Sequence, residues 1–320
     1  MIVVVSVDME GASQLRSVRE IFGCFPEYWA TGRPRLEADV AAACEGLLVG
    51  GADELVVLDN HGGNRINVRA ESLPVGARLE TWNAFDLRSH GVDAMFQVGY
   101  HARGGVDGFL SHTYVPGLRL RLDDELISES HLRAWTVGAP LLGIVGNDLH
   151  LETLGSLAAT PYLVVQHSHG RGEMTPVYDD PSEGLAAIRG FAERCARNAG
   201  SAPTFEIREG ATFSASLPNG DAVGEAMAGG GWARVGDVEY AVELDTWESA
   251  RAPLDAAMGA GLAPYGPYWL GSFDTAEDAA AADQERVAAA AEVFDAWGAE
   301  SQPQWYSEAA DPLPRGFSRN

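Results

Sequence analysis

The chain has 320 residues, of which 46% are hydrophobic, enough to build one large or two moderate domains around a buried core. The formal net charge is −24, and all 22 basic residues are arginine. Such a surface repels phosphate backbones and anionic lipids, so we expect no nucleic-acid partner and no membrane partner. No apolar run approaches the roughly 18 residues that span a bilayer, and no basic segment precedes the first apolar run. We therefore expect a cytoplasmic protein.

Short β-rich runs alternate with helix-like stretches over the first two thirds of the chain. Strands are expected over Ile2–Val7, 54–58, Ala94–Tyr100, 141–145 and 162–166. A helix is expected over 35–49, where apolar side chains fall on one face and Gly50-Gly51 follows, and a second over 124–137. This alternation predicts an α/β domain with a mostly parallel sheet over residues 1–199.

The pattern of expected secondary structure changes after residue 200. Strands are expected in the stretches APTFEIREGATFSASLP and WARVGDVEYAVELDT, and a helix over 247–261. These elements predict a smaller α+β domain over residues 200–265. Residues 266–320 form an Ala-rich, helix-favouring extension that ends in a proline-containing tail.

Several common kinds of site are absent from the sequence. The three cysteines, Cys24, Cys44 and Cys195, are widely spaced and form no CxxC pair, which argues against a disulfide framework and against a thiolate zinc site. Cys24 and Cys44 are expected to be buried. The chain has no GxSxG nucleophile elbow, and the glycine pair in DNHGGN lacks the spacing of a nucleotide-binding loop.

Polar side chains with metal-binding atoms follow the expected strands. Parallel strands end at one edge of their sheet, where ligands bind, so we expect these side chains to gather there. Carboxylate and imidazole ligands suit zinc, manganese or cobalt, and a cation would remove the repulsion between Asp8 and Glu10. The spacing does not decide which histidines bind metal. The strand-end residues are Asp8, Glu10, Asp59, His61, His101, Asp148, His167 and His169, with His112 close behind.

Four motifs in order resemble those of the zinc-dependent D-aminopeptidases of the DppA type. The motifs are SVDMEG, LDNHGGN, GYHARGG followed by SHT, and ISESHLRAWTVGAPLLGIVGND. Their spacing agrees over about residues 1–200, and the likeness extends more loosely to about residue 263. The chain departs from the family at Asn147, where family members have an acid, and after about residue 265, where the family pattern has no counterpart.

The resemblance implies a set of site residues. Asp8 would bridge two metal ions, and His112 would lie beside the metals in the catalytic role. Nothing local marks Glu129, which only the resemblance assigns. His167 and His169 lie on the same sheet edge and are expected near the substrate. The implied metal ligands are Asp8, Glu10, His61, His101 and Glu129.

The function that follows is a dinuclear zinc-dependent aminopeptidase acting on short peptides that contain D-amino acids such as D-Ala. The resemblance also implies a homo-oligomer, a decamer in the characterised type. Two other functions stay open on the sequence: another dinuclear metallohydrolase, such as an amidase or a phosphoesterase, and a non-catalytic binding protein of the same fold. The aromatic loop QLRSVREIFGCFPEYWATGRPR either shapes substrate choice or packs into the core.

Overall fold

The computed structural model describes residues 1–62, 67–82, 84–115, 118–170, 172–217, 220–244 and 247–262, together with residues 288, 291, 292 and 295. Apart from those last four residues, the expected extension over 266–320 lies outside the described residues. No described helix is both long and apolar enough to cross a lipid bilayer.

A seven-stranded sheet forms the first layer, in the order β3-β2-β1-β4-β7-β8-β9. All neighbouring strands are parallel except β8 and β9, which confirms the expected α/β class. The central strands are buried along their length, as expected when both faces of a parallel sheet are covered. The strands are β1 (Ile2–Val7), β2 (Glu54–Asp59), β3 (Ala77–Glu80), β4 (Ala94–Tyr100), β7 (Leu141–Asn147), β8 (Tyr162–Gly170) and β9 (Glu173–Pro176).

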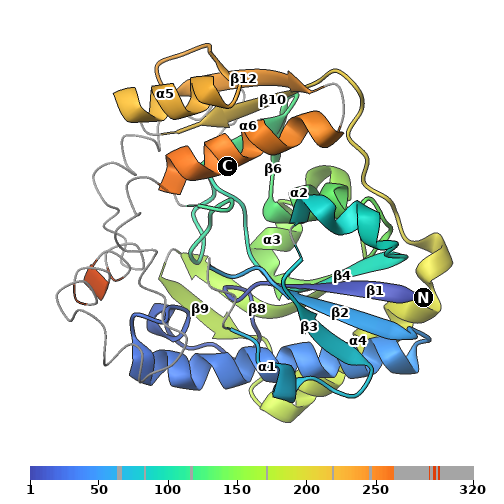
Figure 1. Ribbon diagram of the computed structural model, residues 1–320. Coiled ribbons are helices and arrows are strands. Elements are labelled where there is room, and N and C mark those ends of the chain that lie inside the picture. The colour runs from blue at the N-terminus through green and yellow to red at the C-terminus, as the bar shows by residue number, and fades with distance from the viewer. Residues whose placement is uncertain are drawn as a thin grey trace.

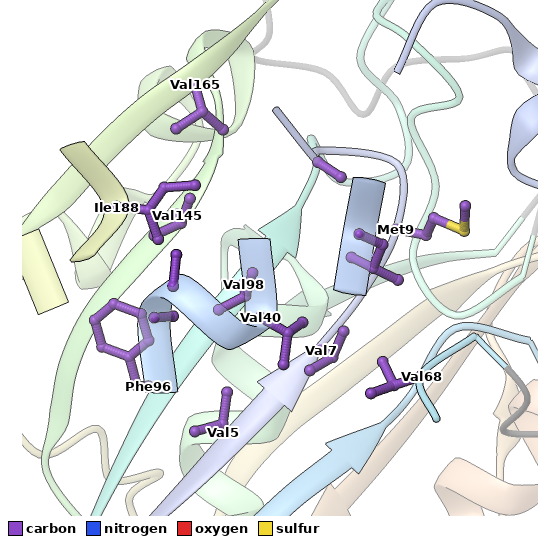
Figure 2. Close-up of a cluster of buried hydrophobic side chains, with 14 of the residues drawn as sticks. Val5, Val7, Met9, Val40, Val68, Phe96, Val98, Val145, Val165 and Ile188 are labelled. Carbon is purple, nitrogen blue, oxygen red and sulfur yellow. The ribbon is translucent and has the colours of Figure 1, made fainter. Parts of the chain in front are cut away.

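Two long helices, α1 (Pro26–Val49) and α4 (Pro181–Arg197), cover one face of this sheet (Figure 1). Between this face of the sheet and the two helices, side chains of β1 and β4 pack with Val40 of α1 and Ile188 of α4 in a hydrophobic core (Figure 2). Helix α1 begins at Pro26 and not at residue 35 as expected. A proline is favoured at the first position of a helix, where its missing N–H would have no partner in any case, so the earlier start is favourable.

The other face of the sheet is covered by α2 (Glu129–Val137), by short helices and by a second sheet (Figure 1). The expected helix over 124–137 was wrong at its start, because Glu125–Ile127 forms strand β6. Ser128 separates the two elements, and its backbone N–H donates to His131 Nδ1 at 3.1 Å, so the helix starts only after this turn. The short helices of the described chain are α3 (Asp148–Glu152), η1 (Val18–Glu20), η2 (Ala70–Ser72), η3 (Ala84–His90), η4 (Gly155–Leu157) and η5 (Ala199–Ser201). Of these, η1, η2 and η5 lie on the side of α1 and α4.

The second sheet is antiparallel, with the order β11-β12-β10-β5-β6. Strands β5 and β6 come from the middle of the chain, so this sheet draws on residues before 200 as well as after. The expected division into three domains stays a prediction. A boundary at residue 200 does not separate the two sheets, because β5 and β6 of the second sheet come before it. The elements are β5 (Arg119–Leu122), β6, β10 (Ala211–Ser216), β11 (Ala233–Arg234) and β12 (Glu239–Leu244), with helices α5 (Asp221–Gly229) and α6 (Trp247–Leu262).

The three cysteines are free and buried in the core around α1 and α4. Burial raises the pKa of the Cys24 and Cys44 thiols to about 12. Both are therefore unreactive packing residues at neutral pH, which confirms the expectation that they are buried.

Candidate metal centre and active site

Six candidate site residues meet at the edge of the larger sheet where its parallel strands end. Each side chain is buried, with at most 7% of the residue exposed. Together they place three carboxylates and three imidazoles in one small region, which would be unstable without a compensating charge. The six are Asp8 and Glu10 after β1, His61 after β2, His101 after β4, His112 in the following loop, and Glu129 at the first turn of α2.

The turn after β1 is pressed against the end of β4. The Asp8 N–H donates to Val98 O at 2.8 Å, and the Gly11 N–H donates to Gly99 O at 2.8 Å. A Cβ atom on Gly11 would lie only 1.9 Å from Tyr100 O. The glycine of the VDMEG motif is therefore required for this close approach, which brings Asp8 and Glu10 beside His101.

Each of the three histidines donates one ring N–H to a backbone carbonyl. Because a carbonyl only accepts, these bonds fix the tautomer and leave the other ring nitrogen with a lone pair. Proteins orient metal-binding histidines in this way. The bonds are His61 Nε2 to Ile21 O at 3.0 Å, His101 Nδ1 to Ala102 O at 2.9 Å and His112 Nδ1 to Leu110 O at 2.7 Å.

The remaining ring nitrogens face carboxylate oxygens. Asp8 Oδ1 lies 3.4 Å from His61 Nδ1, and Asp8 Oδ2 lies 3.3 Å from His101 Nε2. His61 Nδ1 is also 3.1 Å from Glu10 Oε2. Glu129 Oε1 lies 3.9 Å from His101 Nε2 and 3.7 Å from His112 Nε2. An unprotonated imidazole nitrogen and a carboxylate oxygen repel each other in a buried site, because both carry lone pairs. A cation between them, either a proton or a metal ion, would remove the repulsion.

The donor set fits divalent metal ions. Asp8 Oδ2 and His101 Nε2 are buried and have no hydrogen-bond partner among the described residues, which is costly unless an ion binds them. Three overlapping groups have ligand atoms within 4.8 Å of one another. Carboxylate oxygen and imidazole nitrogen are ligands that zinc accepts. The groups are Asp8, Glu10 and His61; Asp8, His101 and Glu129; and Glu10, His101 and His112.

The same contacts shift the pKa values of the metal-free protein. Burial would raise the pKa of Asp8, but the neighbouring His101 and His61 imidazoles outweigh it and hold this pKa well below its usual value. Burial would lower the pKa of His101, but Asp8 raises it to about 10. Burial lowers the pKa of His112 to about 4, and the charge of His101 adds to the effect. His112 is therefore neutral at pH 7, while His101 carries a proton where a metal ion would bind.

The loop that carries His112 is strained on both sides of that residue. Leu110 and Tyr114 have left-handed backbones, with φ of 43° and 59°, although neither is glycine. The Tyr114 N–H donates to Glu129 Oε1 at 2.6 Å, which ties this loop to α2. The His112 ring stacks on the His101 ring, with centroids 4.2 Å apart. Strain of this kind persists where surrounding contacts over-determine a functional residue, and here it fixes His112 beside the acids.

Asp59 has a supporting role in the loop after β2. One carboxylate oxygen accepts the His61 N–H at 3.2 Å, and the other accepts the Asn67 N–H at 2.7 Å. Asp59 belongs to none of the three potential metal groups found among the described residues. It therefore shapes the loop that presents His61.

A cavity of about 180 Å³ opens onto this cluster. Its lining includes the carboxylates Asp8, Glu10 and Glu129 and the apolar side chains of Val115 and Met258. Met258 belongs to α6, so the layer around the second sheet completes a site built mainly on the first. Sequence analysis found no signal for Met258, because nothing local relates it to the strand ends.

His167 and His169 lie on β8 and are exposed. His167 Nδ1 is 2.8 Å from Asp148 Oδ2, and His169 Nε2 is 2.8 Å from Thr175 Oγ1. Neither residue is among the described residues that line the cavity. Their expected substrate role stays a prediction.

Two features noted in the sequence have structural explanations: Asn147 and the aromatic loop. Asn147, which stands where the family has an acid, caps α3 and accepts the His150 N–H at 2.8 Å. In the aromatic loop, Phe22, Phe25 and Trp29 are buried in the core. The loop also supplies the carbonyl of Ile21 that orients His61. The structure therefore supports the packing interpretation of this loop.

Residues 1–255 match the model of the peptidase family M55, whose description is D-aminopeptidase. The chain belongs to this family. The M55 chain is accordingly a metallo-aminopeptidase, a hydrolase of peptide bonds. Comparison with curated proteins gives no significant match.

Among solved structures, the M55 chain is similar to the "Zn-dependent D-aminopeptidase DppA from Bacillus subtilis, a self-compartmentalizing protease". The TM-score is 0.74 with 19% identity, over 82% of this chain and 98% of the other. At this identity the likeness establishes the fold, and the site rests on the geometry above.

Proposed function

We propose that the protein is a dinuclear zinc aminopeptidase that removes N-terminal residues from short peptides containing D-amino acids such as D-Ala. The observation that carries this proposal is Asp8, whose two buried oxygens face two different histidines, His61 and His101. A carboxylate placed between two donor groups suits a bridge between two ions. In this arrangement Asp8, Glu10 and His61 would hold one ion, and Asp8, His101 and Glu129 would hold the other.

The choice of zinc follows from the mixed oxygen and nitrogen ligands and from the zinc dependence of the structurally similar DppA. When bound, zinc would polarise the scissile carbonyl as a Lewis acid. The strongly acidic protein, with a formal net charge of −24, would attract a substrate with a cationic N-terminus.

His112 would move the proton in the reaction. Its Nδ1–H is held by Leu110 O, so Nε2 is the atom left to react. The low pKa of His112, caused first by burial, keeps that nitrogen unprotonated at neutral pH, so it can accept the proton lost by the water that attacks the scissile carbonyl. His112 would then return the proton to the leaving amine.

The cavity favours small substrates. Its volume is about 180 Å³, and Val115 and Met258 offer contacts for a short apolar side chain such as that of alanine. The preference for the D configuration rests on the description of the family. Assays of D-Ala and L-Ala dipeptides would measure this preference directly.

The structurally similar DppA is described as a self-compartmentalizing protease, and on this basis we propose that the M55 chain forms a homo-oligomer. The expected size, a decamer, comes from the family resemblance of the sequence. Sedimentation velocity of the purified protein would measure that size. A cytoplasmic location stays a prediction.

The first experiment is elemental analysis of protein purified without added metal or chelator. We expect about two zinc ions per chain, both lost in Asp8→Asn, because one carboxylate would serve both ions. Asp148→Asn is the matched control, since Asp148 pairs with exposed His167 outside the described lining of the cavity. Wild-type protein that binds no zinc, even in excess, would refute the proposal. Cleavage of phosphate esters but not peptides would indicate a different metallohydrolase.

A further inference from the structure

Arg133 lies in the cavity wall but has no part in the chemistry above. It sits on α2 one turn after Glu129, so the two side chains share a helix face. Its guanidinium carbon is 5.1 Å from the centre of the Tyr114 ring. Its Nε–H is buried without a hydrogen-bond partner, and within the described ranges the guanidinium forms no hydrogen bond or ion pair.

Arg133 is half-buried, and a guanidinium withdrawn this far from water is costly without a paired anion. Burial would lower the pKa of Arg133, but two acids of the wall, Glu129 and Asp8, attract the guanidinium and help to raise this pKa, although neither forms an ion pair with it. Both belong to the metal groups, so in a zinc-loaded site they would serve as metal ligands. The missing anion is therefore best supplied by a ligand in the cavity.

We propose that Arg133 binds the free C-terminal carboxylate of the substrate, and that the enzyme thereby selects unblocked dipeptides and tripeptides. This inference rests on the proposed aminopeptidase function. A guanidinium pairs with a carboxylate through two parallel N–H bonds, which gives direction as well as affinity. Stacking on Tyr114 holds the guanidinium plane ready for such a pair.

The length of the substrate agrees with the position of Arg133. Four residues of helix separate Glu129 from Arg133, a rise of about 6 Å along the axis. Beyond the scissile bond, a dipeptide continues for one residue and a tripeptide for two, which extend roughly 3.5 Å and 7 Å. A short peptide with its reacting carbonyl near Glu129 can therefore place its carboxylate at Arg133.

A purely structural Arg133 would have different consequences. If the guanidinium only stacks on Tyr114 and balances the acids, its loss weakens the site for every substrate alike. If it binds the carboxylate, its loss affects substrates with a free carboxylate more than those without one. The ratio of activities on an acid and its amide separates the two cases.

The test compares D-Ala-D-Ala with D-Ala-D-Ala amide on zinc-loaded protein. We expect wild-type kcat/KM to be roughly 10- to 100-fold higher for the acid, the factor that a charged hydrogen-bonded pair provides. Arg133→Gln should bring the ratio close to one, mainly through a higher KM for the acid. Arg133→Lys keeps the positive charge but cannot form the two parallel N–H bonds of a guanidinium. It should give a ratio of acid to amide activity between those of the wild type and Arg133→Gln.

Controls distinguish loss of carboxylate binding from a general loss of charge or of folding. Arg197→Gln removes the same charge from an exposed ion pair with Glu193 on α4 and should keep the wild-type ratio. Zinc content and melting temperature verify that each variant is folded. Equal wild-type activity on acid and amide, or an equal loss on both in Arg133→Gln, overturns the inference. If wild-type protein cleaves neither compound, the aminopeptidase proposal fails, and calorimetric binding of acid and amide decides the role of Arg133 separately.

Discussion

Replacing Gly11 by alanine tests whether the close approach of β1 and β4 builds the site. The new Cβ would lie 1.9 Å from Tyr100 O and 2.7 Å from Tyr100 C. Both are backbone atoms in a central strand of the sheet, so neither can rotate away. The turn that carries Asp8 and Glu10 must therefore move.

The size of the effect follows from the contact. Because Cβ contacts shorter than 3.0 Å essentially never occur, the backbone must separate by at least 1.1 Å, the difference between 3.0 Å and 1.9 Å. Overpacking of this kind costs about 1–3 kcal/mol. Weakening the bond from the Gly11 N–H to Gly99 O adds about 1 kcal/mol. The free energy of unfolding should thus fall by about 2–4 kcal/mol, which is a melting-temperature change of roughly 3–6 °C for a chain of 320 residues.

Urea unfolding of the metal-free protein measures this loss, and elemental analysis measures the zinc held by the variant. Zinc content should fall too, because displacement by about 1 Å separates the two acids from His101. Gly200→Ala is the matched control: a Cβ there meets no atom within 4 Å, and its backbone φ is not positive. The control should change stability by less than about 0.5 kcal/mol.

The reasoning is refuted if Gly11→Ala unfolds at the same urea concentration as the wild type and retains the same zinc. That result would mean that the turn after β1 shifts at no cost. A loss of stability with full zinc content would instead separate the packing of the turn from the assembly of the site.

Two further predictions concern pH. Burial raises the pKa of Asp39 to about 6 although Ser13 donates two bonds to it, so ionising it in the folded state is unfavourable and stability falls as pH rises from about 4 to 6. Relative to Asp39→Asn, wild-type metal-free protein should lose about 3 kcal/mol between about pH 3 and pH 7 in urea titrations, and parallel curves would contradict the assignment. Because Asp8 raises the pKa of His101 to about 10, zinc binding at pH 7 should release the proton held by His101, so zinc affinity should rise with pH. Calorimetry in buffers of different ionisation enthalpy counts the released protons, and none released would mean that His101 is neutral before zinc binds.

Local patterns predicted much of the larger domain because its strands are continuous apolar runs. Ile2–Val7 and Ala94–Tyr100 were predicted with the bounds that the structure has. Element starts were less certain, since they depend on single residues. Pro26 opens α1 earlier than the apolar spacing indicated, and Ser128 delays α2.

The sequence patterns did not predict which strands pair when the strands lie far apart in the chain. Strands β5 and β6 are short and polar on one side, and they are strands because β10, far along the chain, pairs with β5. A strand of this kind is stabilised by its partners more than by its own residues. The composition change at residue 200 therefore did not reveal that the second sheet begins earlier.

For the site, the sequence by itself determined which residue types stand at the strand ends, because chain order and parallel pairing bring Asp8, His61 and His101 to one edge. Only the tertiary structure decided which atoms face one another, since ring orientation depends on carbonyls such as Ile21 O that lie far away in the chain. Glu129 came from the family motif alone. The placement of Arg133 in the cavity wall came from the fold, because a charged residue on a helix has no local feature that distinguishes a buried site from a solvated face.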